Sequence, residues 1–273
     1  MDRRVAQSPE SSADSSAPIA AWWIGRTLYR DAWDLQHRLV AARAAGSIGD
    51  QLLLLEHEPV LTLGRHSAPA HVLASAQELD SRGIELIRTE RGGEVTYHGP
   101  GQLTAYPIIR MADRGLLVRP LVRALEAALS QTAAVLGVEA GPREGFPGCW
   151  CGAGTRKIGA IGVRIERGVS YHGVALNITV RLSDFELIDA CGIPGAISTS
   201  IARELDRAGG VTTEPTTESV AAAGEAFAPA LAAQLGAPLH GRYSGANPLV
   251  ARRELEALLA AWVPAPAMPG SVS

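Results

Sequence analysis

The sequence predicts an α/β (α+β) fold in which helices cover a mixed β-sheet. Segments with apolar residues at helical spacing occur among short apolar or alternating runs that are typical of strands. No internal repeat and no linker interrupts residues 20–262, so a single domain over residues 19–262 is the simplest prediction. Residues 1–18, rich in Ser, Ala and charge, and residues 263–273, with three prolines, are predicted to be a disordered and a flexible tail.

The elements follow from these patterns in chain order. A first strand is expected over residues 21–26, and Asp31 is expected to cap the next helix. Residues 52–55 form an unbroken apolar run that predicts a buried central strand. Alternation within residues 158–181 predicts an antiparallel pair with its turn at 166–168, Lys157 near one end and His172 near the other. Further strands are expected at 60–63, 84–88, 95–97 and 103–106, and further helices at 75–82, 121–136, 217–235 and 249–262.

Composition is that of an ordinary globular protein. The chain has 47% hydrophobic and 19% charged residues and a net charge of -3, which favours neither nucleic acid nor an anionic membrane as a partner. No apolar run reaches the roughly 18 residues of a membrane span, and the N-terminus has no signal-peptide core. Three cysteines, an odd number, argue against a disulfide framework. A cytoplasmic location is therefore expected.

The stretch RGGEVTYHGPGQLTAYP, residues 91–107, is the strongest candidate for a site. Its glycines allow a backbone to approach a ligand closely, beside Arg91, His98 and Gln102. We expect the HGPGQ turn to join two short strands and to present open amides, so that a Cβ at Gly99 or Gly101 would obstruct a bound ligand. The alternative is a tight hairpin whose glycines serve only geometry.

Individual thiols and one amine are the candidate reactive groups. Cys191 lies in a loop between glycines and a proline, whereas Cys149 and Cys151 in FPGCWCG are expected to be buried, a zinc site being the weaker alternative. A nucleophilic cysteine needs a neighbouring cation or base to form its thiolate. Lys157 is the single lysine among 25 basic residues, which favours a role that arginine cannot fill over that of a solvated surface lysine.

Three blocks, RGGEVTYHGPGQLTAYPI, RKIGAIGVRIERGVSYHGVALNITVRL and CGIPG, together resemble the lipoyl(octanoyl) transferase family, the octanoyl-acyl carrier protein:protein N-octanoyltransferases. The resemblance implies a fold like the catalytic domains of lipoate-protein and biotin-protein ligases. It also implies Cys191 as the acyl-accepting nucleophile and Lys157 as the partner that lowers its pKa. The residues that it implies for substrate binding are Arg91, Gly92, Gly93, Glu94, Val95, Thr96, Tyr97, His98, Ala160, Ile161, Gly162, Gly173, Val174 and Ala175.

The implied reaction is a two-step acyl transfer without metal or cofactor, the first step of endogenous protein lipoylation. Cys191 takes an octanoyl or lipoyl group from acyl carrier protein, and a lysine of a lipoyl domain then accepts it. Lipoyl domains of 2-oxoacid dehydrogenase complexes and the glycine cleavage H protein are the implied acceptors. We expect the amides of the glycine turn to stabilise the oxyanion, His98 and Gln102 to orient the donor, and the face of Ile158, Val163 and Leu176 to hold the acyl chain.

Three other functions remain open on the sequence. A lipoate or biotin protein ligase would share the fold and the acceptor but activate its acid with ATP. A cysteine hydrolase would pair Cys191 with His172 or His98 and use water as the acceptor. A binding module would retain the fold without a catalytic dyad. Cys191 in CGIPG favours the thioester route over the ligase.

Overall fold

The computed structural model describes residues 17–189, 197–209 and 217–262. Its helices are α1 (Tyr29–Ala44), α2 (Ala76–Ser81), α3 (Val118–Val135), α4 (Ile201–Arg207), α5 (Thr217–Gln234) and α6 (Pro248–Ala260). Its strands are β1 (Ile19–Thr27), β2 (Asp50–His57), β3 (Val60–Leu63), β4 (Glu85–Arg88), β5 (Val95–His98), β6 (Gln102–Ile108), β7 (Gly141–Arg143), β8 (Phe146–Cys151), β9 (Arg156–Glu166), β10 (Val169–Asn177), β11 (Ile197–Ser198) and β12 (Leu239–Arg242). The predicted tails fall mainly on residues 1–16 and 263–273, which lie outside the described residues.

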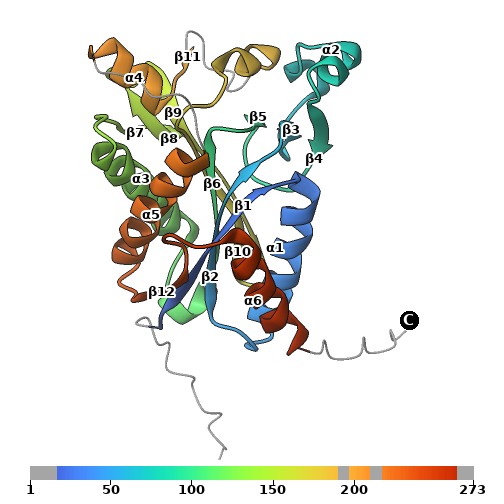
Figure 1. Cartoon of the computed structure of the whole chain (residues 1–273), viewed down its shortest axis with the longest axis vertical. Helices are drawn as coiled ribbons and strands as arrows, with labels where there is room; N and C mark the ends of the chain where they lie inside the picture. The colour runs from blue at the N-terminus through green and yellow to red at the C-terminus, as the bar shows by residue number, and fades with distance from the viewer. Residues whose placement is uncertain (1–16, 190–196, 210–216, 263–273) are drawn as a thin grey trace, which may run out of the picture.

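A large mixed sheet runs through the centre of the molecule (Figure 1). Within the described ranges it has nine strands in the order β12-β1-β2-β6-β10-β9-β8-β7, with β11 paired to β9. Helices α3 and α5 pack on one face, where Leu52, Leu103 and Leu176 are fully buried. Helices α1 and α6 cover part of the other face, against Leu53, Leu55 and Tyr106. The layered mixed α/β architecture confirms the predicted fold class.

A second, three-stranded sheet lies beyond one end of α1 (Figure 1) and has the order β4-β3-β5. β5 pairs antiparallel with β3, whereas β6 pairs with β2 and β10 of the large sheet. The HGPGQ turn therefore connects two sheets, and the hairpin alternative is wrong. The carbonyl of Gly101 accepts hydrogen bonds from the amides of Ile178 and Thr179, which fixes the turn against the end of β10.

Most predicted elements are present within a few residues of their expected ends. The β9–β10 pair turns at Arg167 and Gly168, both with positive φ, the backbone that a two-residue hairpin loop favours. The prediction that Asp31 caps α1 is wrong, because Leu28 occupies the N-cap and Asp31 lies in the first turn. Strands β7 and β8, helix α4 and strand β12 were not predicted from the sequence. No helix in the described part of the chain is long and apolar enough to span a bilayer.

Candidate active site

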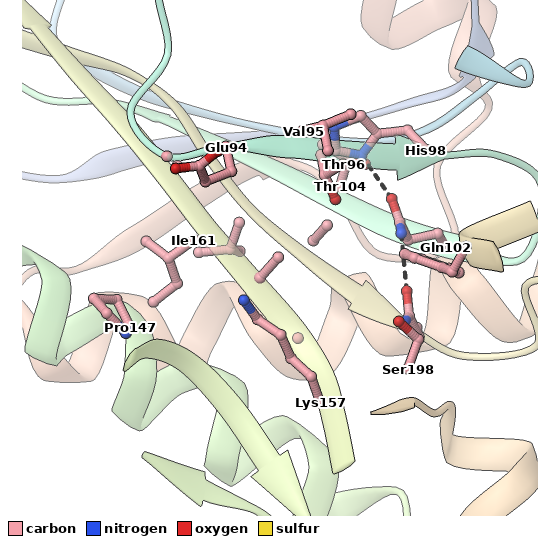
Figure 2. A pocket seen from close by; sticks show the side chains of 18 of the residues that line it. Glu94, Val95, Thr96, His98, Gln102, Thr104, Pro147, Lys157, Ile161 and Ser198 are labelled. Atoms are coloured by element: carbon pink, nitrogen blue, oxygen red, sulfur yellow. Dashed lines mark hydrogen bonds between the residues drawn. The ribbon is translucent and has the colours of Figure 1, made fainter. Parts of the chain in front are cut away.

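A cleft of about 800 Å³ lies between the two sheets (Figure 2). Its floor comes from three neighbouring strands of the large sheet, β6, β10 and β9, and on β6 the lining residues Gln102, Thr104 and Tyr106 alternate as side chains on one face of a strand do. Ala175 of β10 pairs with Thr104 on one side and Ala160 on the other, and Gly173 pairs with Gly162. The middle of this floor is built almost entirely from glycine and alanine, which leaves room above it.

Lys157 points into this cleft because β9 carries a bulge (Figure 2). Cys149 of β8 pairs with Gly159, but the next residue, Trp150, pairs with Lys157, so Ile158 is an extra residue in β9. Ile158 is fully buried in the core beneath the sheet. Without the bulge, Lys157 would share the face of Gly159, which packs toward Leu129 of α3. The extra residue turns Lys157 to the cleft instead.

The surroundings of Lys157 keep its side chain in place. Its Nζ lies 5.2 Å from the ring centre of Trp150, a cation–π distance. Gly148 leaves space for the lysine stem, since a Cβ there would lie 3.1 Å from the lysine Cε and 2.6 Å from the carbonyl oxygen of Gly159. The backbone of Lys157 pairs with Ser198 of β11, and its carbonyl accepts a 2.9 Å hydrogen bond from the amide of Thr199.

The RGG segment covers the floor from the side of the small sheet. The amide of Gly92 donates to the carbonyl of Val163 at 3.3 Å, and a Cβ on Gly162 would lie 3.0 Å from the carbonyl oxygen of Gly92. Two glycines are therefore needed where this segment crosses β9. Arg91 is buried, and its guanidinium donates to the hydroxyl and carbonyl of Thr62 and to Gly92. Burial lowers the pKa of Arg91 from its ordinary value.

A chain of hydrogen bonds crosses the polar end of the cleft. His98 Nδ1 lies 2.7 Å from Gln102 Oε1, Gln102 Nε2 donates to Asn177 Oδ1 at 2.8 Å, and Asn177 Nδ2 donates to Thr199 O at 2.8 Å (Figure 2 draws part of the chain). Gln102 Nε2 donates to two oxygens, Tyr97 O and Asn177 Oδ1, which fixes the orientation of the amide. Gln102 Oε1 is therefore the acceptor toward His98, so Nδ1 of His98 carries the proton. Burial and the nearby Arg91 lower the pKa of His98 to about 3, so the ring is neutral at physiological pH.

Glu204 of α4 holds the strand segment next to Lys157. Its carboxylate accepts two hydrogen bonds from Arg156, at 2.8 and 2.7 Å, and one from the Thr199 hydroxyl at 2.6 Å. Arg156 precedes Lys157 in β9, and Thr199 donates to Lys157. The hydrogen bonds from Arg156 lower the pKa of Glu204 below its ordinary value. A half-buried charge network thus braces both sides of the lysine.

Two tyrosine–histidine couples form the inner wall. Tyr106 Oη lies 2.7 Å from His57 Nε2, and Tyr29 Oη lies 3.4 Å from His172 Nδ1. His172 also approaches Glu90 at 3.3 Å through Nε2 and has a positive φ of 54°. Burial lowers the pKa of both His57 and His172, so each neutral ring accepts a hydrogen bond from the hydroxyl of its tyrosine. Burial likewise raises the pKa of both tyrosines, which stay protonated.

The cleft brings together all but one of the expected substrate-binding residues within the described chain. Arg91 to Thr96 and His98 line it from one side, and residues 160–162 and 173–175 from the other. Tyr97 does not line it, because its ring is buried in a separate core and packs edge-on against Phe185. Cys191 falls in residues 190–196, outside the described residues. The residues that flank this segment, Asp189 and Ile197, both line the cleft.

Two other expectations about the site are wrong. The glycine turn does not face the cleft, since neither Gly99 nor Gly101 lines it; the Gly101 amide donates to Glu56, and a Cβ on Gly99 would meet the Tyr97 ring and not a ligand. Ile158 and Leu176 cannot hold an acyl chain, because both are fully buried beneath the sheet, whereas Val163 does line the cleft.

Cys149 and Cys151 are buried free thiols, as predicted. Burial raises the pKa of Cys149 to about 11 and that of Cys151 to about 12, so neither is a thiolate at neutral pH. No group of three potential metal ligands occurs in the described part of the chain.

Sequence reasoning missed several groups that complete the site. Thr104, Tyr106 and Asn177 were visible only as strand residues, although their alternation along β6 and β10 places them on the floor. Val118, Val122, Phe146 and Pro147 form an apolar outer edge that no motif marked. Their position depends on how α3 and β8 pack beside β9, which local patterns do not encode.

Comparison with known proteins identifies the class of this molecule. A model of the lipoyl protein ligase A/B catalytic domain matches residues 28–224. The octanoyltransferase of Chloroflexus aurantiacus is 45% identical over 211 residues, which cover 77% of this chain and 94% of that protein. That of Acidobacterium capsulatum is 46% identical over 209 residues, covering 72% and 85%. The chain therefore belongs to the lipoyl protein ligase A/B catalytic domain family, among relatives that are octanoyltransferases.

Membership makes this chain an enzyme, an acyltransferase of protein lipoylation, as the three motif blocks predicted. Solved structures agree on the fold. Lipoate-protein ligase A bound with ATP matches with a TM-score of 0.55 at 15% identity, covering 88% of this chain and 94% of that one. A bipartite lipoate protein ligase from Thermoplasma acidophilum matches with a TM-score of 0.51 at 15% identity, covering 88% and 92%.

Proposed function

We propose that this acyltransferase moves an octanoyl group from acyl carrier protein to a lysine of lipoyl domains through a thioester on Cys191. The single observation that carries the proposal is the bulge at Ile158, which turns the only lysine of the chain into the cleft. A further support is that Asp189 and Ile197, on either side of the Cys191 segment, line that same cleft. Lipoyl domains of 2-oxoacid dehydrogenase complexes and the glycine cleavage H protein are the proposed acceptors.

In the first step the Cys191 thiolate attacks the carbonyl carbon of the donor thioester. The new carbon–sulfur bond forms as the bond to the pantetheine sulfur breaks, and the carrier leaves as a thiolate that takes a proton from solvent. Lys157 supplies the cation that favours the Cys191 thiolate. All of the implied substrate-binding residues except Tyr97 are proposed to line the substrate site.

In the second step the neutral amine of the acceptor lysine attacks the same carbon. The carbon–nitrogen bond forms, the bond to Cys191 sulfur breaks, and the proton lost by the amine passes to Lys157, when that side chain is uncharged, or to the leaving thiolate. The donor is already a thioester, so neither step needs a nucleotide. This is what separates the proposal from an ATP-dependent ligase.

Intact mass spectrometry after mixing with octanoyl-acyl carrier protein, without ATP or magnesium, tests the proposal. We expect an octanoyl adduct on the wild type and none on Cys191→Ser, with both proteins folded. Lys157→Ala should raise the pH at which Cys191 is alkylated, and Lys157→Arg should restore little of the rate. An adduct mapped to Cys149 or Cys151, or an adduct that requires ATP, would overturn the proposal in favour of another nucleophile or a ligase.

A further inference from the structure

The floor of the cleft is closed at one end, and the closure lies at a defined distance from Lys157. Gly162 is four residue steps from Lys157 once the extra Ile158 is discounted, which is about 13 Å at 3.3 Å per residue. Between these two positions the described floor presents the methyl groups of Ala160 and Ala175 and the side chain of Thr104. An extended octanoyl chain, with the radius of its terminal methyl group, takes up most of this run, and a longer chain meets its end.

The closure itself is a close contact between two backbones. Gly92 sits on β9 at Gly162 and Val163, with its amide 3.3 Å from the Val163 carbonyl oxygen. A Cβ added to Gly162 would lie 3.4 Å from Arg91 Cδ, which is ordinary van der Waals distance. No space for a ligand remains between the RGG segment and the floor at this point. Within the described residues, the cleft does not continue past this point along β6, β10 or β9. The next residues on this face of the three strands are Ile108, Tyr171 and Arg164, and none of them lines the cleft.

The side walls at the closed end suit the end of an alkyl chain. Tyr106, Tyr29 and His172 surround it, and their ring polar atoms already hydrogen-bond to His57, to Glu90 or to each other. An apolar group placed there leaves none of these buried polar groups without a partner, which is the main cost of covering them. These three rings are held by β6, β10 and α1, whereas Arg91 and Gly92 belong to the segment between β4 and β5.

We propose that the floor from Lys157 to Gly162 holds the acyl chain of the donor, and that the closed end formed by Arg91, Gly92, Tyr106 and His172 sets the maximum chain length. The inference rests on the proposed function and adds to it a specificity-determining element. The competing path leaves the floor sideways over the edge of β9, where β8 no longer pairs beyond Ala160. That path ends against Val118, Val122 and Pro147.

Three variants distinguish these paths. Ala160→Leu adds bulk to the floor, and Ala160 is half-buried in an open cleft, so the larger side chain fits without overpacking. His172→Gly opens the closed end, and glycine accepts the φ of 54° that strains the native residue. Val122→Phe fills the outer edge only. His172→Asn is the matched control for the second variant, because asparagine tolerates the same backbone and retains most of the bulk.

The measurement is the rate of adduct formation with a series of acyl carrier protein thioesters from butanoyl to dodecanoyl. Ala160→Leu should slow octanoylation about fifty-fold, the equivalent of three lost methylene contacts, while butanoylation changes little. His172→Gly should raise the decanoyl-to-octanoyl rate ratio about tenfold, whereas His172→Asn and Val122→Phe should leave the ratio as in the wild type. Melting curves verify that each variant is folded.

A length profile that moves with Val122→Phe and not with Ala160→Leu would overturn the inference in favour of the edge path. This comparison remains decisive even if His172→Gly does not fold. An unchanged profile in both Ala160→Leu and His172→Gly would also overturn it. If the wild type forms no adduct with any donor, the proposed function itself fails, which is a different outcome from an adduct whose length profile does not respond.

Discussion

Thr104 carries a hydroxyl in the floor of the cleft that has no hydrogen-bond partner within the described chain. The residue is 1% exposed, so its Oγ1 is not satisfied by bulk water. Burying a hydroxyl without a partner costs about 1–3 kcal/mol. Thr104→Val replaces the hydroxyl with a methyl group and should raise the free energy of unfolding by about 1 kcal/mol, the lower end of that range.

The chain offers a matched control in Thr179. Its Oγ1 is also buried without a partner among the described residues, but Thr179 does not line the cleft. Each valine variant should therefore raise the melting temperature, by about 2–4 °C for 1 kcal/mol in a chain of this size. Thermal melts monitored by circular dichroism measure this, and equal shifts are expected for the two sites.

Acylation tests what lies over Thr104. Its Oγ1 is already buried without a partner among the described residues before any ligand binds, so an octanoyl chain on the floor costs it no further hydrogen bond, and Thr104→Val should leave the KM for octanoyl-acyl carrier protein unchanged. Thr179→Val should also leave the KM unchanged. If Thr104→Val instead raises the KM or lowers kcat, the hydroxyl hydrogen-bonds to the substrate, and the reasoning that an alkyl segment lies over it is refuted.

Two further substitutions test the frame of the site. Gly99→Ala should lower the free energy of unfolding by about 1–3 kcal/mol, because the added Cβ overpacks against Tyr97. Gly49→Ala is the control and should be neutral, since a Cβ there has nothing within 4 Å. Equal melting temperatures of the two variants would refute the structural role of the turn. Glu204→Gln should destabilise the fold at neutral pH by removing the partner of Arg156. The depressed pKa of Glu204 stabilises the native state above the ordinary carboxyl pKa of about 4.3, and this stabilisation is lost as pH falls through the folded value. The difference between wild type and Glu204→Gln should therefore shrink in melts below about pH 4, and a constant difference would contradict the assignment.

The fold was largely predictable because its signals are local. The unbroken run at residues 52–55 is a fully buried strand at the centre of the large sheet, where both faces are covered by helices. The β9–β10 hairpin is marked by its alternation and by Arg167 and Gly168 at the turn. β8 escaped prediction because FPGCWC begins with residues typical of turns, and its strand structure depends on pairing with β9.

The site was predictable in composition but not in geometry. The RGG segment was expected to contact a ligand through its glycines, and one of them, Gly92, is needed for a closer partner, the backbone of β9 at Gly162 and Val163. The glycines of the HGPGQ turn looked equally suited to ligand binding, yet they satisfy Glu56 and leave room for Tyr97. Glycine marks a close approach in both cases, and the sequence alone does not say whether the neighbour is substrate or protein.

Lys157 shows most directly why register decides function in this fold. Strict alternation from Ala160 back along β9 places Ile158 on the cleft side and Lys157 beneath the sheet, and a one-residue slip exchanges every such assignment. The bulge reverses the alternation at this one point, so the apolar Ile158 enters the core and the amine enters the cleft. Trp150, Gly148 and the Thr199 amide then hold the lysine where it is aimed. A single additional residue in one strand thus connects the packing of the core to the position of the candidate catalytic cation.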